Sequence, residues 1–340
     1  MRTRKHKHEY LEAIELLLET HPEGLIQAEI ARRIGVHRST VNRLIPDLPG
    51  YIYIDDLDGG KWKLDRAKRP LNVQFNLHEA TAIHLAARLL ASVIDRQNPH
   101  AASTLRKLSI TLERMAPHIS RHLAEAAEMI DRNAQWQDAN YLRVLEVLTL
   151  AWAEGRKVQV WHRKSHGEPV NCYTFSPYFI EPGAVGRSTY AIGLREPPGE
   201  LRTFKIERIE RAERTSEPYS IPPDFNPDDL LSGAWGIWFT NAEPVEVVLQ
   251  FSPRAGRRVR ETRWHPTQQI TEQADGSLIW RAKVAEPIEM RPWIRGWGPD
   301  VIVLAPESLR RSIAAEAEQT LKHYYEVSNE PNFSAVGKNR

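Results

Sequence analysis

Residues 24–48, GLIQAEIARRIGVHRSTVNRLIPDL, carry side chains of the types that recognise nucleic-acid bases. Arginine can bind both acceptors of guanine, and asparagine can bind the donor and the acceptor of adenine in the major groove. Between Glu29 and Asp47 there are four arginines and no acidic residue, so the local charge is strongly positive. We therefore predict a DNA-reading element with these contact residues, which include two lysines of the following hairpin: Arg33, His37, Arg38, Ser39, Thr40, Asn42, Arg43, Lys61 and Lys63.

Two helices joined by a tight turn are needed to present these side chains. The sequence predicts a first helix over 26–34, a turn at Gly35 and Val36, and a second helix that opens at His37. Val41 and Leu44 can hold the second helix on a core, and Pro46 ends it near Ile45 because proline lacks a backbone donor. The competing interpretation is an arginine-rich, solvated helix in a module that binds other proteins.

A hairpin follows these helices in residues 51–64, YIYIDDLDGGKWKL. Its residues alternate in polarity on both sides of Asp58-Gly59-Gly60, which is a tight-turn signal. Residues 9–48 as a whole predict three short helices, and three short helices followed by a two-stranded ribbon are typical of a winged helix-turn-helix domain. Lys61 and Lys63 would then lie on the wing, where lysines can contact phosphate.

A second set of candidate residues lies in ELRTFKIERI, residues 200–209. If this segment is one strand, Arg202, Phe204, Ile206 and Arg208 share a face, which is unusual for a strand that is buried. Guanidinium groups bind phosphate, so these arginines could hold an anionic ligand. Alternatively, they pair with acids such as Glu200 or Glu210 and have only a structural role.

No sequence motif of a known enzyme class is present. The segment HEATAIH places His78 and His84 six residues apart, whereas the zinc-protease motif needs its histidines four apart on one helical face. RGWGPD, residues 295–300, is too short for a dinucleotide fingerprint and stands between helix and strand in the wrong order. We predict no enzymatic activity, no metal site and no cofactor.

The composition limits the class of protein. The chain has 340 residues, a net charge of +2, 41% hydrophobic and 26% charged residues, so it is an ordinary globular protein without a global positive charge. The single cysteine, Cys172, excludes an intramolecular disulfide, and its apolar surroundings predict a core position. Neither an N-terminal signal sequence nor a run of 18 apolar residues is present, which predicts a cytoplasmic protein without membrane contact.

The order of predicted elements indicates an α+β multidomain protein. Apolar residues with helical spacing dominate 76–132, and short strands with a period of two follow a helix that starts at 141. The exposed apolar faces of the helices in 76–132 predict a homodimer. The expected parts are a winged helix-turn-helix domain (1–69), a helical connector (70–140), a small Sm- or SH3-like barrel (141–217), a proline-rich linker (218–240), an α+β sandwich (241–327) and a disordered tail (328–340).

The order of these parts resembles that of bacterial transcription factors with a WYL domain and a C-terminal WCX extension. ELRTFKIERI is similar to the Arg-x-Phe-Arg-Leu-Asp-Arg-Ile pattern of that family, and ADGSLIWRAKV…WIRGWGPDVIVLAPESLR is similar to its WCX signature. The chain departs from the family at Thr189-Tyr190-Ala191, where only the tyrosine of the naming motif is kept, and at Ser176, where the family has a histidine.

The resemblance implies a ligand site for a nucleic acid or nucleotide in the barrel. The matching positions and a second basic cluster in 254–263, which only Glu261 balances in sequence, give these candidate ligand residues: Ser176, Tyr190, Arg202, Lys205, Arg208, Arg254, Arg257 and Arg258. The basic cluster could equally be a solvated face or a contact with a second subunit.

The sequence therefore predicts a homodimeric transcription regulator, a repressor, that binds a duplex DNA operator through the winged helix and an effector through the WYL domain. An alternative is an accessory protein that binds RNA or single-stranded DNA beside a nuclease or defence system and recognises no operator. Arg38, Asn42 and Arg43 on an intact second helix, together with a basic wing, favour duplex DNA.

Overall fold

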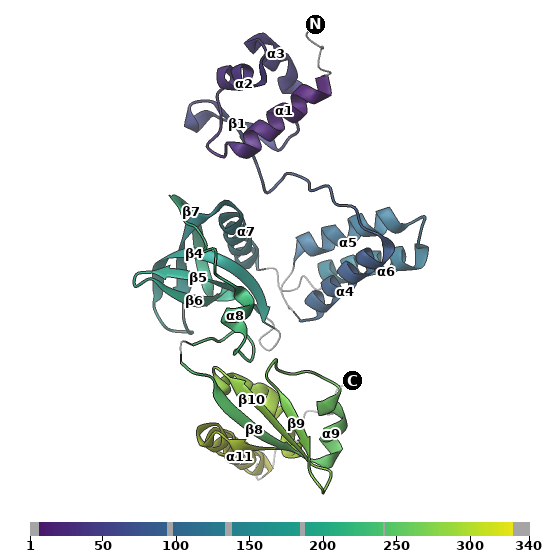
Figure 1. The fold of residues 1–340 in the computed structure, drawn as a ribbon, viewed down its shortest axis with the longest axis vertical. Coiled ribbons are helices and arrows are strands. Elements are labelled where there is room, and N and C mark those ends of the chain that lie inside the picture. The colour runs from purple at the N-terminus through teal and green to yellow at the C-terminus, as the bar shows by residue number, and fades with distance from the viewer. Residues whose placement is uncertain (1–6, 94–97, 133–137, 184–187, 241, 329–340) are drawn as a thin grey trace. The chain divides into compact units, whose positions relative to one another are not determined.

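The computed structural model describes residues 7–93, 98–132, 138–183, 188–240 and 242–328 (Figure 1). The chain divides into two units, Met1–Ala80 and Thr81–Arg340. The described residues form helices and antiparallel sheets of two, five and four strands, which confirms a multidomain α+β protein. No helix in these ranges is both long and apolar enough to cross a membrane.

The first unit contains three helices and a two-stranded ribbon. Helix α1 (Lys7–Thr20), α2 (Gln27–Ile34) and α3 (Arg38–Leu44) precede a 3₁₀ turn (Ile45–Asp47), and β1 (Ile52–Asp55) pairs with β2 (Lys61–Leu64). One apolar core joins helices and ribbon, and its most buried members are Ile14, Leu18, Ile30, Ala31, Val41, Leu44 and Ile52. Val41 and Leu44 therefore hold α3 on this core, as the sequence predicted.

The turn between α2 and α3 depends on Gly35. Its φ of 74° lies in the left-handed region, where side chains with a Cβ atom are strained, and its N–H closes the end of α2. Val36 then donates a backbone hydrogen bond to the carbonyl of Ala31 at 3.0 Å. His37 caps α3 because its Nδ1 accepts a hydrogen bond from the backbone N–H of Ser39 at 3.3 Å.

Helix α4 (Leu77–Val93) spans the division between the two units at Ala80, and α5 (Pro99–Leu112) and α6 (Pro117–Arg132) belong to the second unit. A reciprocal capping box starts α4, since Asn76 and Glu79 each accept a backbone hydrogen bond from the other, at 3.0 and 2.8 Å. The hydroxyls of Ser109 and Ser120 each donate to the other residue's carbonyl at 2.9 Å, which satisfies these buried polar groups between α5 and α6.

Residues 139–218 form a helix and a five-stranded antiparallel sheet. Helix α7 (Ala139–Glu154) packs on one face of the sheet and shares its core with Val158, Val160, Phe175 and Ile209 (Figure 1). The strands are β3 (Arg156–Arg163), β4 (Val170–Gly183), β5 (Ser188–Glu196), β6 (Glu200–Lys205) and β7 (Ile209–Pro218), in the order β6-β5-β4-β3-β7. A short 3₁₀ turn, η4 (Ile206–Arg208), connects β6 to β7.

The sheet is strongly curled around Phe204. In a flat sheet, β6 and β3 would lie about 14 Å apart, because two strands separate them at roughly 4.8 Å per step. The ring centroids of Phe204 in β6 and His162 in β3 are nevertheless 5.0 Å apart. The inner face of β6 therefore folds over the inner face of β3.

The predicted linker 218–240 packs against the five-stranded sheet. Tyr219 donates a hydroxyl hydrogen bond to the carbonyl of Pro177, and Phe225 packs edge-on against Tyr178 with centroids 5.0 Å apart. Further apolar residues of the segment and of α8 (Pro227–Leu231) cover Phe179 and Ile192: Ile221, Leu230, Leu231 and Phe239. The sequence did not predict that this segment covers the sheet, because prolines among apolar residues are also typical of linkers.

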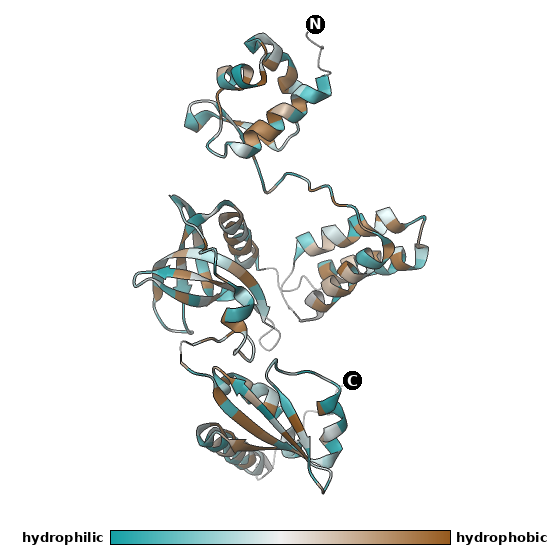
Figure 2. Ribbon diagram, viewed as in Figure 1, coloured by the Kyte–Doolittle hydropathy of each residue, from teal (hydrophilic) through white to brown (hydrophobic). Residues whose placement is uncertain are grey.

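The C-terminal part contains a four-stranded antiparallel sheet in the order β11-β8-β10-β9, along which apolar residues recur (Figure 2). Its elements are β8 (Val245–Phe251), α9 (Pro253–Arg260), β9 (Gln269–Glu272), β10 (Leu278–Val284), α10 (Arg291–Arg295), β11 (Val301–Ala305) and α11 (Glu307–Ser328). Trp293 lies at the centre of an aromatic cluster with Trp235, Trp264, Trp280 and Trp297, at centroid distances of 4.6–5.9 Å. Trp235 comes from the end of the supposed linker.

Two smaller expectations concern Cys172 and the C-terminal residues. Cys172 is exposed and donates a weak hydrogen bond to Gln159 at 3.3 Å, so its predicted core position is wrong. It lies on the outer face of β4, because its strand neighbours Tyr173 and Phe175 turn inward. Of the predicted tail 328–340, Ser328 ends α11, and the remaining positions lie outside the described residues.

Because Phe225 is part of a packed cover, we expect Phe225→Ala to destabilise the five-stranded sheet by about 2 kcal/mol, less than the loss of a fully buried ring. The backbone amides of β4 should then exchange hydrogen about 30-fold faster, measured by mass spectrometry. Asp224→Ala, at the exposed neighbouring position, is the control and should leave exchange unchanged. Equal exchange in both variants would show that the segment is a tether after all.

Candidate nucleic-acid interface and ligand site

The outward face of α3 carries most of the predicted base-reading residues. His37, Arg38, Ser39, Asn42 and Arg43 are exposed, and Thr40 is half-buried. Arg38 and Asn42 are one turn apart, so they share a face, and Arg43 lies beside them. Among the described residues Arg43 has no recorded hydrogen bond or ion pair, which leaves its whole guanidinium group available.

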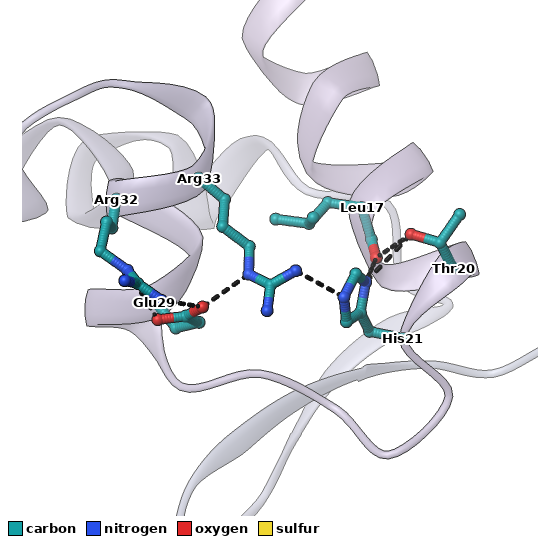
Figure 3. Close-up of polar contacts among 6 residues, drawn as sticks. All are labelled: Leu17, Thr20, His21, Glu29, Arg32 and Arg33. Atoms are coloured by element: carbon teal, nitrogen blue, oxygen red, sulfur yellow. Dashed lines mark hydrogen bonds and ion pairs between the residues drawn. The ribbon is translucent and has the colours of Figure 1, made fainter.

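Arg33 has a structural role that the sequence did not reveal (Figure 3). Its Nε donates to Glu29 at 2.6 Å, and its terminal nitrogen donates to Nε2 of His21 at 2.6 Å. Because Arg33 can only donate, His21 must carry its proton on Nδ1, which donates to the carbonyl of Leu17 at 2.9 Å. This chain of contacts ties α2 to the end of α1 and makes Arg33 less available to DNA than Arg43.

Glu29 also reduces the positive charge that the sequence indicated around α2. Hydrogen bonds from Arg32 and Arg33 lower the pKa of this carboxyl to about 2, so it is ionised at all physiological pH values. Four arginines and no acid lie between Glu29 and Asp47. Two of these arginines, Arg32 and Arg33, form ion pairs with Glu29. The free positive charge is concentrated on Arg38 and Arg43.

The two lysines of the ribbon are paired with aspartates. Lys61 lies 3.0 Å from Asp58, and Lys63 lies 2.9 Å from Asp55 and 2.7 Å from Asp58. The lysines lower the pKa of both carboxyls through these hydrogen bonds. Asp56 adds a third acid at the tip, so the ribbon carries more negative than positive charge. Phosphate contact by Lys61 and Lys63 stays a prediction, and it would have to compete with these pairs.

The predicted ligand arginines do not share a strand face. Strand β6 ends at Lys205, and the chain then turns through η4, so Arg208 does not follow the alternation that places Arg202 and Phe204 on one side. Ile206, the first residue of this turn, is buried in the core beside Phe204. Arg202 forms an ion pair with Glu200. This pair is the one expected if Arg202 has only a structural role.

Tyr190 and Lys205 lie directly opposite each other in the β5–β6 ladder, three positions away from Arg202. Burial of the Tyr190 phenol raises its pKa, and its ring lies against Gly183, where an added Cβ would approach to 2.5 Å. Ser176 is 2% exposed, so its hydroxyl is not at the surface. The structure therefore separates Tyr190 and Lys205 from Arg202 by about 10 Å of strand and hides Ser176.

A cluster of basic and aromatic side chains lies instead on the inner face of the curled sheet. Arg195 of β5 stands over the ring of Tyr173 at 5.2 Å, and the ring of Phe204 lies 5.7 Å from Tyr173 and 5.0 Å from His162. Arg202 follows the same face of β6 two residues before Phe204 and shares Glu200 with Arg195, whose contact is 4.0 Å. We call Tyr173, Arg195, Arg202, Phe204 and His162 the basic–aromatic cluster.

Sequence analysis found only Arg202 among the polar members of this cluster. His162 and Arg195 each continue the inward alternation of a strand, after Val158 and Val160 and after Ala191 and Gly193. That alternation was the available signal. What the sequence could not supply is the curl of the sheet, which brings β3 and β6 together.

His162 is a neutral group in the folded protein. Burial, and then the nearby charge of Arg208, lower its pKa from 6.5 to about 4. The unfolded chain therefore binds a proton more readily than the folded chain between these values, and this group makes the protein less stable as the pH falls from 6.5 to 4. The Arg208 charge thus acts on the basic–aromatic cluster, although no ion pair of Arg208 is recorded within the described ranges.

The basic cluster of α9 is balanced by acids distant in sequence. Arg254 donates two hydrogen bonds to Asp300, at 2.7 and 3.1 Å, and Arg260 lies 2.9 Å from Glu272. Arg257 pairs with Glu261, whereas Arg258 stands 5.0 Å over the ring of Trp297. The expectation that only Glu261 balances these arginines is wrong, because β9 and the turn before β11 bring further carboxylates to the helix.

Comparison with known proteins identifies two domains. The model of the WYL domain matches residues 143–214, and the model of the WCX domain matches residues 243–321. No curated protein sequence matched the chain. The WYL match covers α7 and most of the five-stranded sheet, and the WCX match covers nearly all of the C-terminal sheet and its helices.

Solved structures give weaker likenesses. Proteasome accessory factor B/C (PafBC) of Arthrobacter aurescens is 17% identical over 95% of this chain and 50% of that chain, with a TM-score of 0.33. A CRISPR Cas-related protein is 10% identical over 76% of this chain and 89% of that chain, with a TM-score of 0.40. This chain thus spans half the length of the PafBC chain. The two domain matches show that this chain contains a WYL domain and a C-terminal WCX domain.

Proposed function

We propose that this protein is a ligand-responsive, DNA-binding transcription regulator that acts as a repressor. The observation that carries the proposal is α3, which buries Val41 and Leu44 and presents Arg38, Asn42 and Arg43 to solvent. Three helices followed by a two-stranded ribbon are the order of a winged helix-turn-helix domain, in which such a helix enters the major groove. The absence of catalytic motifs in the sequence supports a binding protein rather than an enzyme.

Base reading in this proposal rests on α3, because the ribbon carries more acid than base. Among the described arginines of the unit, Arg43 has the freest guanidinium group, so Arg43→Ala should weaken binding to the operator by about 1–3 kcal/mol and relax discrimination at one base pair. Gel-shift titrations with the operator and its single-base variants measure this. Arg32→Ala, which removes an exposed arginine paired with Glu29, is the control and should change affinity much less. If Arg43→Ala binds as tightly as the unaltered protein, α3 does not read DNA.

The ion pairs of the ribbon favour a second candidate function. A duplex-binding winged helix usually adds phosphate contacts from its wing, and here Lys61 and Lys63 are held by Asp55 and Asp58. The second candidate is an accessory protein that binds RNA or single-stranded DNA beside a nuclease system. Competition of a random duplex against single strands of the same sequence separates the two: preference for the single strand supports this candidate.

We propose that the five-stranded sheet is an Sm- or SH3-like barrel whose basic–aromatic cluster binds a nucleotide or nucleic-acid effector. Guanidinium groups bind phosphate and aromatic rings stack on bases, and the cluster places both kinds of group side by side. The buried Nε of Arg195 has no hydrogen-bond partner among the described residues, so its guanidinium group is not fully satisfied by the protein. Three other residues predicted from the sequence would flank this site. Arg208 would do so from η4, and the paired residues Tyr190 and Lys205 from the far end of the β5–β6 ladder.

If the cluster holds the effector, Arg195→Ala combined with Arg202→Ala should abolish the effector's influence on operator affinity, a coupling of about 1–3 kcal/mol. Operator affinity without effector should stay close to that of the unaltered protein, because the reading residues lie in the first unit. Short oligonucleotides and nucleotides are the effectors to titrate, with fluorescence anisotropy of labelled operator as readout. Arg211→Ala, which removes an arginine from the ring of Trp161 in β3, is the matched control. An unchanged response in the double variant would refute this site.

We propose a homodimer formed through α4, since a two-fold operator matches a two-fold protein. The helix exposes Ala82, Leu85, Ala86 and Leu89, whose spacing makes one apolar stripe, with Leu85 62% and Leu89 65% exposed. Leu85→Glu with Leu89→Glu should convert a particle of twice 39.0 kDa into one of 39.0 kDa in light scattering. Ile110→Glu, at an exposed apolar position of α5, should leave the dimer intact. A monomeric unaltered protein at micromolar concentration contradicts the proposal.

A further inference from the structure

Gln27, the first residue of α2, bridges two outward side chains of α3. Its Oε1 accepts a hydrogen bond from Nε of Arg38, and its Nε2 donates one to Oδ1 of Asn42, both at 3.4 Å. Arg38 and Asn42 are four residues apart and share a face of α3. A single amide group thus contacts both of the side chains that are best suited to bind guanine and adenine.

The chemistry of the three groups fixes their orientation. An arginine can only donate, so the oxygen of Gln27 must face Arg38, and its nitrogen then faces Asn42. This donor in turn holds the oxygen of the Asn42 amide toward α2. Gln27 therefore selects one of the two orientations that a free asparagine amide could adopt.

These contacts leave the base-reading atoms available. A guanine is bound by two nitrogens of the guanidinium fork, and Gln27 engages only Nε, so both terminal nitrogens of Arg38 stay free. Adenine needs Nδ2 of Asn42 and one lone pair of Oδ1, and Gln27 occupies only the other lone pair. The bridge thus orders both side chains without competing for the bases.

Gln27 has no part in the core that would explain its position. It is half-buried, and the core residues of α2 are Ile30 and Ala31. The N-cap residue Ile26 makes no side-chain hydrogen bond, so Gln27 does not belong to a capping arrangement either. Its recorded polar side-chain contacts in the described chain are the two with α3.

We infer that Gln27 is a positioning residue that sets the base preference of α3. Side chains held in their binding orientation lose less conformational freedom on binding. The resulting gain in binding free energy applies only to bases that fit that orientation. Both bonds are long, so the effect of each is small, and discrimination between bases should change more than affinity. This inference rests on the proposed function, since it assumes that α3 reads duplex DNA.

The test starts with selection of binding sites from a random duplex library by the unaltered full chain. Dissociation constants are then measured for the selected site and its single-base variants, with the unaltered protein, Gln27→Met and Gln27→Ala. Methionine keeps the volume of glutamine without its hydrogen bonds. We expect both variants to lose about threefold to tenfold of the discrimination at the base pairs read by Arg38 and Asn42. Affinity for random duplex, its salt dependence and the melting temperature should stay unchanged.

A double-mutant cycle separates positioning from any structural effect. In a chain that already carries Arg38→Ala and Asn42→Ala, Gln27→Met should have no further effect on discrimination. An amide at the start of a helix can also bind phosphate, and in that case the variants would weaken binding equally for every sequence, which overturns the inference. Unchanged discrimination in both variants overturns it as well. If the unaltered protein selects no site, the proposed function fails and this inference falls with it.

Discussion

The curl of the five-stranded sheet around Phe204 determines how the WYL domain is built. Phe204 lies on the short strand β6, yet it contacts rings from β3 and β4 and shares the core of α7. The curl requires a close approach of β5 to β4, and Gly193 permits it, because an added Cβ would lie 2.0 Å from the carbonyl oxygen of Ser176. The turn η4 then lets the chain cross from β6 to β7 while Ile206 stays in the core.

The outer and the inner face of the curled sheet differ in what covers them. On the outer side, Tyr178, Phe179 and Ile192 are covered by the segment that follows β7, so this face is closed by the chain itself. On the inner side, the edge of the core is polar and aromatic, and Arg195 stands over Tyr173 there. Burying a guanidinium nitrogen without a hydrogen-bond partner costs free energy, and a bound anion would remove that cost.

Pairing with acids distributes the positive charge of this protein. Arginines or lysines of α2, of the ribbon and of α9 were candidate contact residues, yet Glu29, Asp58 and Asp300 each hold one or more of them. Exposed pairs of this kind contribute little to stability, because water and salt screen them. Their consequence here is electrostatic: Arg38 and Arg43 on α3 form no ion pair with an acid among the described residues, so no neighbouring carboxylate neutralises their positive charges.

The sequence by itself determined several local features of the first unit. The turn at Gly35, the buried positions Val41 and Leu44 and the end of α3 before Pro46 follow from local rules, since backbone conformation and helical spacing depend on neighbouring residues. The resemblance to WYL and WCX proteins likewise depends on short patterns, and the domain matches confirm it.

Only the tertiary structure decided which charges are free and which side chains meet. Arg254 pairs with Asp300 across 46 positions, and His162 meets Phe204 across 42, so no local pattern contains either contact. Alternation predicts where side chains point within a strand, but it did not predict that β6 ends at Lys205 and that the 3₁₀ turn η4 follows, so the single strand predicted through 202–208 is wrong. Contacts between distant residues depend on how sheets curl and helices pack, and those are properties of the whole domain rather than of any segment.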